Sequence, residues 1–215
     1  MMSPPITRPR HVIVVAHPNP NSFVATIAEA YRETVEACGQ EAIVRDLYAL
    51  KFDPVLKDSE RPGPELYSAA PDVRAELDVV AGCEALVLVY PIWFGAPPAI
   101  LKGYIDRVLG YPVSVHGAQS QQGNGLLKGT RLLSISTSGA DDVWLAEQGQ
   151  ERSIRTLFDH YIAHAFGMTA QGHLHLAGVV EGLAARFADQ KLRDVKDRAR
   201  HECAAIAAQH GGRAA

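Results

Sequence analysis

The sequence has few of the features that mark secreted, membrane-spanning or metal-binding proteins. Its three cysteines, Cys38, Cys83 and Cys203, lie far apart without a C-x-x-C pair, so we expect reduced thiols and no metal site. No run approaches the roughly 20 apolar residues of a membrane helix, and the first ten residues lack the apolar stretch of a signal peptide. We therefore expect a cytoplasmic protein without membrane insertion.

An excess of charge of one sign is also missing. The 215 residues include 21 Lys+Arg and 24 Asp+Glu, a net charge of −3, which offers no basic surface for nucleic acid. Apolar residues make up 47% and charged residues 21%, an ordinary globular composition. Repeats and linkers are absent, so we expect residues 1–215 to form a single domain with frayed ends at 1–10 and 209–215.

Two nucleotide-binding motifs are absent as well. The chain contains neither G-x-G-x-x-G nor G-x-x-x-x-G-K-[ST], which disfavours a dinucleotide-binding Rossmann site and a P-loop NTPase. Any bound phosphate must therefore be held by hydroxyl, amide and imidazole groups.

The chain does contain alternating strand-like and helix-like segments. Strands are expected at 11–16, 42–45, 85–90, 130–136 and 173–177. Helices are expected at 22–38, 72–81, 98–109, 151–165 and 184–208, and 110–129 is expected to be a long loop. This alternation predicts an α/β fold with a parallel sheet covered by helices on both faces. Ligands of such folds bind beyond the carboxyl ends of the strands.

The first strand-end loop runs from His17 to Phe23, directly before a helix. Asn21 and Ser22 are good N-cap residues, and the free N–H groups of a helix N-terminus bind anions, so a phosphate would fit here. The alternative is that Ser22 only caps the helix.

Two further loops follow the third and fourth strands. Trp93 and Phe94 lie in a Pro/Gly-rich loop and suit a planar heterocycle, or alternatively pack against the next helix. The segment 136–139, Ser-Thr-Ser-Gly, supplies hydroxyl groups and a close backbone approach to a ligand.

Several segments together resemble a known family. They are Ala16-His17 with Ser22-Phe23, residues 46–50 with 52–54, 91–95, 98–108 and 134–139. In this order, over residues 11–180, they resemble the flavodoxin-like NAD(P)H:quinone oxidoreductases. The resemblance implies a doubly wound five-stranded sheet of order 2-1-3-4-5 and a homodimer with flavin at the subunit interface. It also implies that NAD(P)H reduces the flavin and that the flavin then reduces a quinone.

The resemblance also assigns roles along the three loops. Contacts to the flavin pyrophosphate and ribityl chain are implied for His17, Asn21, Ser22 and Phe23. The isoalloxazine is implied to lie along Pro91, Ile92, Trp93, Phe94 and Gly95. Its pyrimidine side is implied to meet Ser136, Thr137, Ser138 and Gly139. The protein supplies position and electrostatics, and the flavin supplies the hydride chemistry.

The chain departs from the family at its catalytic positions. Where animal quinone reductases carry a Tyr and a His beyond the glycine loop, this chain has Trp144 and Gln150, neither of which exchanges a proton near neutral pH. The tyrosines of the acceptor pocket are missing too, and His116 is the local candidate for a proton donor. A solvated loop histidine is the alternative for that residue.

The histidine pairs His160/His164 and His173/His175 have spacings that could bind zinc, but no carboxylate motif accompanies them, so we expect packing or dimer contacts. The sequence as a whole favours a flavin-dependent NAD(P)H oxidoreductase for quinone, azo or nitro compounds. FAD is favoured over FMN, because the segment from Asp46 to Pro54 resembles the FAD-using branch. A flavodoxin-type electron carrier and a regulatory subunit of a membrane transporter remain alternatives.

Overall fold

The computed structural model describes residues 8–60, 69–111, 113 and 125–211. Five strands form one sheet in the order β2-β1-β3-β4-β5, and every neighbouring pair is parallel. The strands are β1 (Arg10–Val15), β2 (Glu41–Asp46), β3 (Ala85–Pro91), β4 (Arg131–Thr137) and β5 (Thr169–Leu176). The predicted parallel sheet and its strand order are confirmed.

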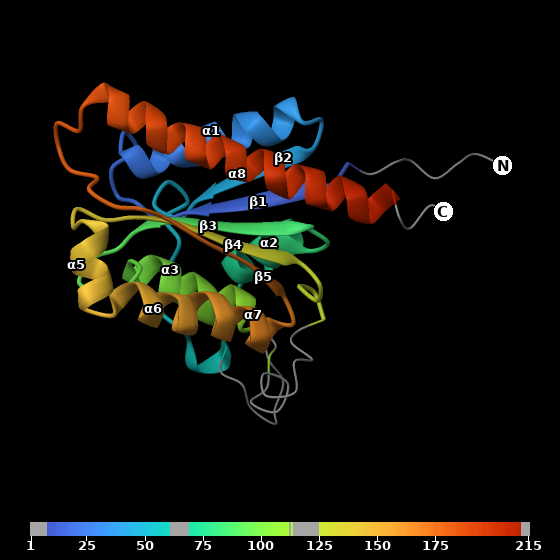
Figure 1. Ribbon diagram of the computed structural model, residues 1–215. Coiled ribbons are helices and arrows are strands. Elements are labelled where there is room, and N and C mark those ends of the chain that lie inside the picture. The colour runs from blue at the N-terminus through green and yellow to red at the C-terminus, as the bar shows by residue number, and fades with distance from the viewer. Residues whose placement is uncertain (1–7, 61–68, 112, 114–124, 212–215) are drawn as a thin grey trace.

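Helices cover both faces of this sheet (Figure 1). One face carries α1 (Phe23–Ala37) and α8 (Ala185–Gly211), and Ile13 and Val15 of β1 point into this layer. The other face carries α2 (Pro71–Val80), α3 (Ala99–Tyr104), α6 (Gln150–Ile154) and α7 (Tyr161–Phe166), and receives Val12 and Val14. Side chains of a strand alternate between faces, so the continuously apolar strands supply both cores.

Some element boundaries differ from the expected ones. The helix expected at 98–109 is α3 followed by a π-helical turn, η2 (Ile105–Leu109), and the one expected at 151–165 is α6, the π-helical η3 (Arg155–His160) and α7. A short 3-10 helix, η1 (Asp58–Glu60), and the six-residue α5 (Asp142–Glu147) were not expected. The strand β5 begins at Thr169 rather than His173, and its start gave no strand signal in the sequence because Ala170 and Gly172 are of weak β-propensity.

Two residues of the segment from Pro98 to Val108, Gly103 and Arg107, make the contacts that pack this segment against its neighbours. A Cβ atom at Gly103 would collide with the backbone of Pro54, so only glycine lets α3 approach the segment after β2 this closely. Arg107 is buried, and its guanidinium donates to Glu60 at 2.7 and 2.8 Å and to Asp72 at 2.7 Å. These contacts fix α3 and η2 against the segment after β2, against η1 and against α2.

No helix in the described part of the chain is both long enough and apolar enough to span a lipid bilayer.

Candidate functional site

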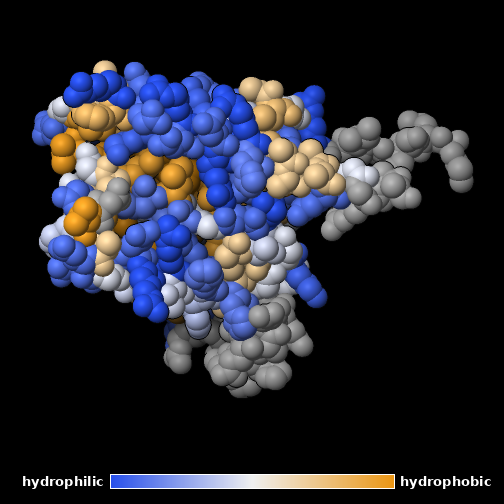
Figure 2. Space-filling view, viewed as in Figure 1, coloured by the Kyte–Doolittle hydropathy of each residue, from blue (hydrophilic) through white to orange (hydrophobic). Residues whose placement is uncertain are grey.

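A hollow of about 150 Å³ opens at the carboxyl ends of β1, β3 and β4. Residues that follow these three strands, together with one residue after β5, line it. They are His17, Ser22, Phe23, Val24, Pro91, Ile92, Trp93, Thr137, Ser138, Gly139 and Val179. Figure 2 shows hydrophobic residues gathered at this edge of the molecule, between α5 and the start of α8.

The N-terminus of α1 forms the first wall of the hollow. Ser22 is the N-cap, and its Oγ accepts the backbone N–H of Ala25 at 3.2 Å. The first turn of α1 carries no acidic side chain, so the positive end of the 15-residue helix is not neutralised from within. His17 lies beside it, with its ring centroid 5.6 Å from that of Trp93. This wall is suited to an anion such as a phosphate.

A tight turn after β3 forms the second wall. The backbone of Trp93 exchanges hydrogen bonds with that of Ala96 at 2.9 and 3.1 Å. Phe94 and Gly95 between them have φ of 49° and 84°, as a type I′ turn requires. Positive φ is unfavourable for a phenylalanine, and its side chain is fully exposed. The turn thus holds an aromatic ring out in solvent at the rim of the hollow.

The loop after β4 forms the third wall and is joined to the second. The backbone N–H of Ile92 donates to the carbonyl of Thr137 at 2.7 Å, and that of Val179 donates to the carbonyl of Ser138 at 2.8 Å. A Cβ at Gly139 would meet only atoms of Val179 and Val180 at 3.8 Å or more. The backbone here is therefore held by residues that follow the neighbouring strands β3 and β5, while Gly139 leaves its surroundings open.

Four of the predicted cofactor-binding residues do not line this hollow. Asn21 and Phe94 are exposed beside it, and Gly95 lies on the back of the turn, where an added Cβ would meet Nε2 of Gln150 at 2.6 Å. Ser136 lies beneath the loop, within β4. The sequence reasoning missed Val24 and Val179, although the position of Val179 after β5 obeys the same strand-end rule.

The predicted catalytic residues lie in different places. Trp144 is in the first turn of α5 and half exposed, with its backbone N–H bound by the N-cap Asp141 at 2.8 Å. Gln150 begins α6 and lines a second, very small hollow together with Ile92, Leu145, Glu151, Ile154, His173 and His175. Because Ile92 lines both hollows, Gln150 lies next to the first one. His116 lies outside the described residues.

A chain of hydrogen bonds that the sequence reasoning did not anticipate runs beneath the third wall. His173 Nδ1 lies 2.9 Å from Asp159 Oδ2, and its Nε2 lies 2.6 Å from Ser136 Oγ. The same hydroxyl lies 2.8 Å from His175 Nδ1, and His175 Nε2 lies 2.9 Å from Ser138 Oγ. We call Asp159, His173, Ser136, His175 and Ser138 the polar chain. It joins a buried carboxylate of η3 to a wall of the hollow.

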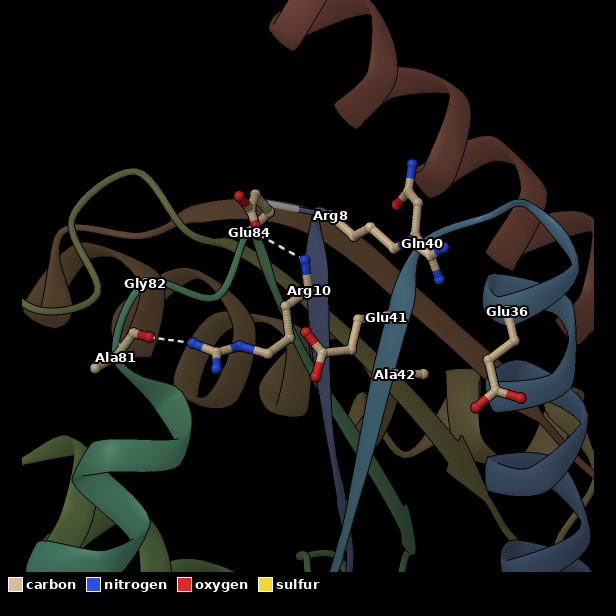
Figure 3. A pocket seen from close by; sticks show the side chains of 9 residues that line it. All are labelled: Arg8, Arg10, Glu36, Gln40, Glu41, Ala42, Ala81, Gly82 and Glu84. Atoms are coloured by element: carbon tan, nitrogen blue, oxygen red, sulfur yellow. Dashed lines mark hydrogen bonds between the residues drawn. The ribbon is translucent and has the colours of Figure 1, made fainter. Parts of the chain in front are cut away.

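A larger hollow of about 900 Å³ lies at the opposite edge of the sheet, where the strands begin (Figure 3). Arg10, Glu41 and Glu84 from the starts of β1, β2 and β3 line it, among others. The side chain of Arg10 donates to the carbonyl of Ala81, and its backbone N–H donates to Glu84 at 2.7 Å. Charges of both signs meet there, and no predicted site residue does.

The sheet order and a hollow at the carboxyl ends of its strands define a flavodoxin-like α/β protein. A family model described as the flavodoxin-like fold matches residues 9–200. An uncharacterized NAD(P)H oxidoreductase of Haemophilus influenzae is 32% identical over 67% of this chain and 71% of its own length. The chain belongs to the flavodoxin-like NAD(P)H:quinone oxidoreductase family.

Further relatives agree on the fold. NAD(P)H dehydrogenase [quinone] 1 of Cavia porcellus is 32% identical over 63% of this chain, which spans 55% of that enzyme's length. An NAD(P)H:quinone oxidoreductase from Methanothermobacter marburgensis superposes with a TM-score of 0.70 at 24% identity, over 90% of this chain and 96% of that one. General stress protein 14 of Treponema denticola, in complex with FMN, superposes with a TM-score of 0.63 at 19% identity, over 90% of this chain and 99% of that one.

Proposed function

We propose that this protein is a flavin-dependent oxidoreductase that passes a hydride from NAD(P)H to a quinone or a similar acceptor. The observation that carries the proposal is the convergence of three loops on one hollow, with a helix N-terminus, an aromatic turn and a hydroxyl-bearing loop as its walls. These walls fit the phosphate, the flat ring and the polar ring edge of a flavin. The relatives named for this activity support the same conclusion.

The residues of the chain have separate tasks in this proposal. The N-terminus of α1 with Ser22 and His17 binds the phosphate, and Ile92 and Trp93 bind the flat ring system. The loop at Ser138 and Gly139 approaches the polar ring edge. A bound flavin would accept the hydride and pass it on.

We also propose that a second copy of the chain completes the site. The hollow of about 150 Å³ is smaller than the roughly 300–1,000 Å³ of ordinary ligand pockets. Trp93, Phe94 and Trp144 are large apolar side chains left 41% or more exposed at this edge. An apolar rim around an incomplete pocket is what an interface between copies needs. Size-exclusion chromatography with light scattering tests this, and a monomer that binds flavin at full affinity would contradict it.

The flavin is proposed to be FAD rather than FMN on the similarity of residues 46–54 to the FAD-using branch. The relative from Treponema denticola binds FMN, so cofactor release and mass spectrometry are needed to decide between the two.

The experiment that tests the function is an absorbance titration of the purified protein under anaerobic conditions. A visible flavin band that bleaches with NADH or NADPH and returns on addition of menadione is the expected result. A bound flavin that neither nucleotide reduces would contradict the enzyme and favour a carrier or a regulatory subunit. Failure to bind any flavin after reconstitution with FAD and FMN would contradict the proposal altogether.

A further inference from the structure

The hydrogen bonds of the polar chain require a definite number of protons if all of them form together. Ser138 Oγ lies 2.9 Å from the carbonyl of Ala140, and a carbonyl can only accept, so the single hydroxyl proton of Ser138 is used there. The contact between Ser138 Oγ and His175 Nε2 therefore needs a proton on Nε2. This fixes one end of the chain.

Three contacts remain, and each also needs one proton. They join His175 to Ser136, Ser136 to His173, and His173 to Asp159. One proton comes from the Ser136 hydroxyl and one from neutral His173, while that of neutral His175 is already placed on Nε2. When all its hydrogen bonds are formed, the chain thus holds one proton more than it would hold with both imidazoles neutral and Asp159 ionised.

The extra proton can occupy either ring. With the proton on His173, Ser136 accepts from His173 Nε2 and donates to His175 Nδ1. With the proton on His175, both of these hydrogen bonds are reversed, and Ser136 turns its hydroxyl toward His173. The two arrangements use the same heavy-atom positions, so the extra proton moves from His173 to His175, toward the hollow, without rearrangement of the fold.

The surroundings of the chain favour this extra positive charge. The side chains of His173 and Asp159 are 3% and 4% exposed, so Asp159 acts on His173 with little screening by water. Glu151 from α6 lines the small hollow beside both histidines, and no lysine or arginine is among the described residues that line it. Tyr90 from β3 meets His173 edge-on at 6.2 Å, and burial raises the pKa of its hydroxyl, so it stays neutral.

Asp159 itself shows an unusual feature for a structural carboxylate. Its Oδ1 is buried and accepts no hydrogen bond from the part of the chain that the structure describes. A buried carboxylate with one unpaired oxygen is costly unless a positive group compensates it. A proton on His173, which lies 2.9 Å from Asp159 Oδ2, would supply that group.

We propose that the polar chain is a proton relay that serves the acceptor in the hollow through Ser138, an inference that rests on the proposed function. A quinone that becomes a hydroquinone takes a hydride, which NAD(P)H supplies, and one proton, which the relay supplies. To deliver a proton, the hydroxyl of Ser138 turns from the carbonyl of Ala140 to the acceptor oxygen and gives up its proton there, and His175 Nε2 replaces that proton. Ser136 then protonates His175 Nδ1 and takes the Nε2 proton of His173, which stays neutral beside ionised Asp159. After the product leaves, a proton from solvent in the hollow returns to Ser138, and the same transfers in reverse restore the proton of His173.

The proton count can be tested on flavin-free protein by ¹⁵N NMR of the histidine rings at pH 7. In the unmodified protein, one ring of the pair His173 and His175 is expected to be doubly protonated. In Asp159→Asn, both rings are expected to be neutral. His160→Gln is the matched control, because His160 neighbours Asp159 on η3 with an exposed side chain. Two neutral rings in the unmodified protein would overturn the proposal.

The role of the relay can be tested by stopped-flow reoxidation of the reduced holoenzyme with two acceptors. Menadione needs a proton from the protein and ferricyanide does not. Asp159→Asn is expected to slow reoxidation by menadione about 100-fold, within the range for general acid catalysis. Its rates with ferricyanide and its reduction by NAD(P)H are expected to stay unchanged.

A second variant guards against misfolding of the first. Ser138→Ala keeps the buried pair of Asp159 and His173 and removes the last donor of the relay, and it is expected to slow reoxidation by menadione more than reoxidation by ferricyanide. Equal slowing with both acceptors, or no slowing with menadione, would overturn the relay. If the unmodified protein binds no flavin or is not reduced by NAD(P)H, the proposed function fails and the catalytic role of the relay with it, while the NMR result still decides the proton count.

Discussion

The buried guanidinium of Arg107 gives the sharpest test of how this fold is held together. Arg107 and Glu60 are each 1% exposed at their side chains and form two hydrogen bonds of 2.7 and 2.8 Å. The replacement Arg107→Met fills a similar volume and leaves Glu60 buried without a counter-charge. Removal of one partner of a buried ion pair costs about 3–5 kcal/mol of unfolding free energy, because the remaining charge is uncompensated.

The double variant separates this penalty from the loss of the pair itself. With Glu60→Gln added to Arg107→Met, no charge of the pair is left buried, and we expect most of the lost unfolding free energy to return. Glu60→Gln alone is expected to cost about 1–3 kcal/mol, since Arg107 keeps its contacts to Asp72 and to the carbonyl of Asp53. Urea unfolding at pH 7 measures all four proteins.

The dependence of the unfolding free energy on acidic pH provides an independent check of the pair between Arg107 and Glu60. The hydrogen bonds of Arg107 hold the pKa of Glu60 below its ordinary value of 4.5. A lowered pKa in the folded state means that the pair stabilises the fold above pH 4.5 and that this stability is lost as the pH falls below it. The unmodified protein should therefore lose more unfolding free energy between pH 5 and 3 than Glu60→Gln does. A double variant no more stable than Arg107→Met, or equal acid sensitivity, would refute the reasoning.

Three further predictions concern single positions. Gly103→Ala should lower the unfolding free energy by about 1–3 kcal/mol in urea, because its Cβ meets the backbone of Pro54; an unchanged midpoint would contradict it. Gly139→Ala should leave the unfolding free energy unchanged but weaken flavin binding at least tenfold in a fluorescence titration. Gly211→Ala, equally free of clashes, should change neither quantity. Equal flavin affinities of Gly139→Ala and the unmodified protein would show that the ligand does not approach this loop. Phe94→Asp should weaken self-association on dilution, because its exposed ring would be replaced by a charge; an unaltered dissociation constant would exclude Phe94 from the interface.

The elements that the sequence predicts well are those whose own residues decide their structure. The strand β3 is buried along its whole length and is continuously apolar in the sequence, and α1 has Ser22 as its cap and an apolar face. The short α5 was missed because six residues give no clear period, and its start depends on the cap by Asp141. The π-helical turns within the helices at 98–109 and 151–165 leave no periodic signal either.

The hollow could be located from the sequence because it follows from topology. Parallel strands end at one edge of the sheet, so residues after β1, β3 and β4 must meet there whatever their side chains. The detailed lining could not be predicted, since Phe94 points outward only because its turn takes positive φ at two positions. Whether a residue of such a loop lines a cavity or faces solvent is decided by backbone geometry that composition does not reveal.

The polar chain is harder still to predict from the sequence, because it depends on a single irregularity in the pairing of β4 with β5. In the register of β4 with β5, Leu132 pairs with Ala170 but Leu133 pairs with Gly172, so β5 contains one extra residue. Without this bulge, Ser136 would pair with Leu174, and His173 and His175 would point to the face of α1 and α8. The bulge instead places both histidines on the face of Ser136, and Gly172 accommodates it with a φ of 112° that other residues rarely adopt. The alternating histidines are visible in the sequence, but the face on which they act is set by one glycine three residues before His175.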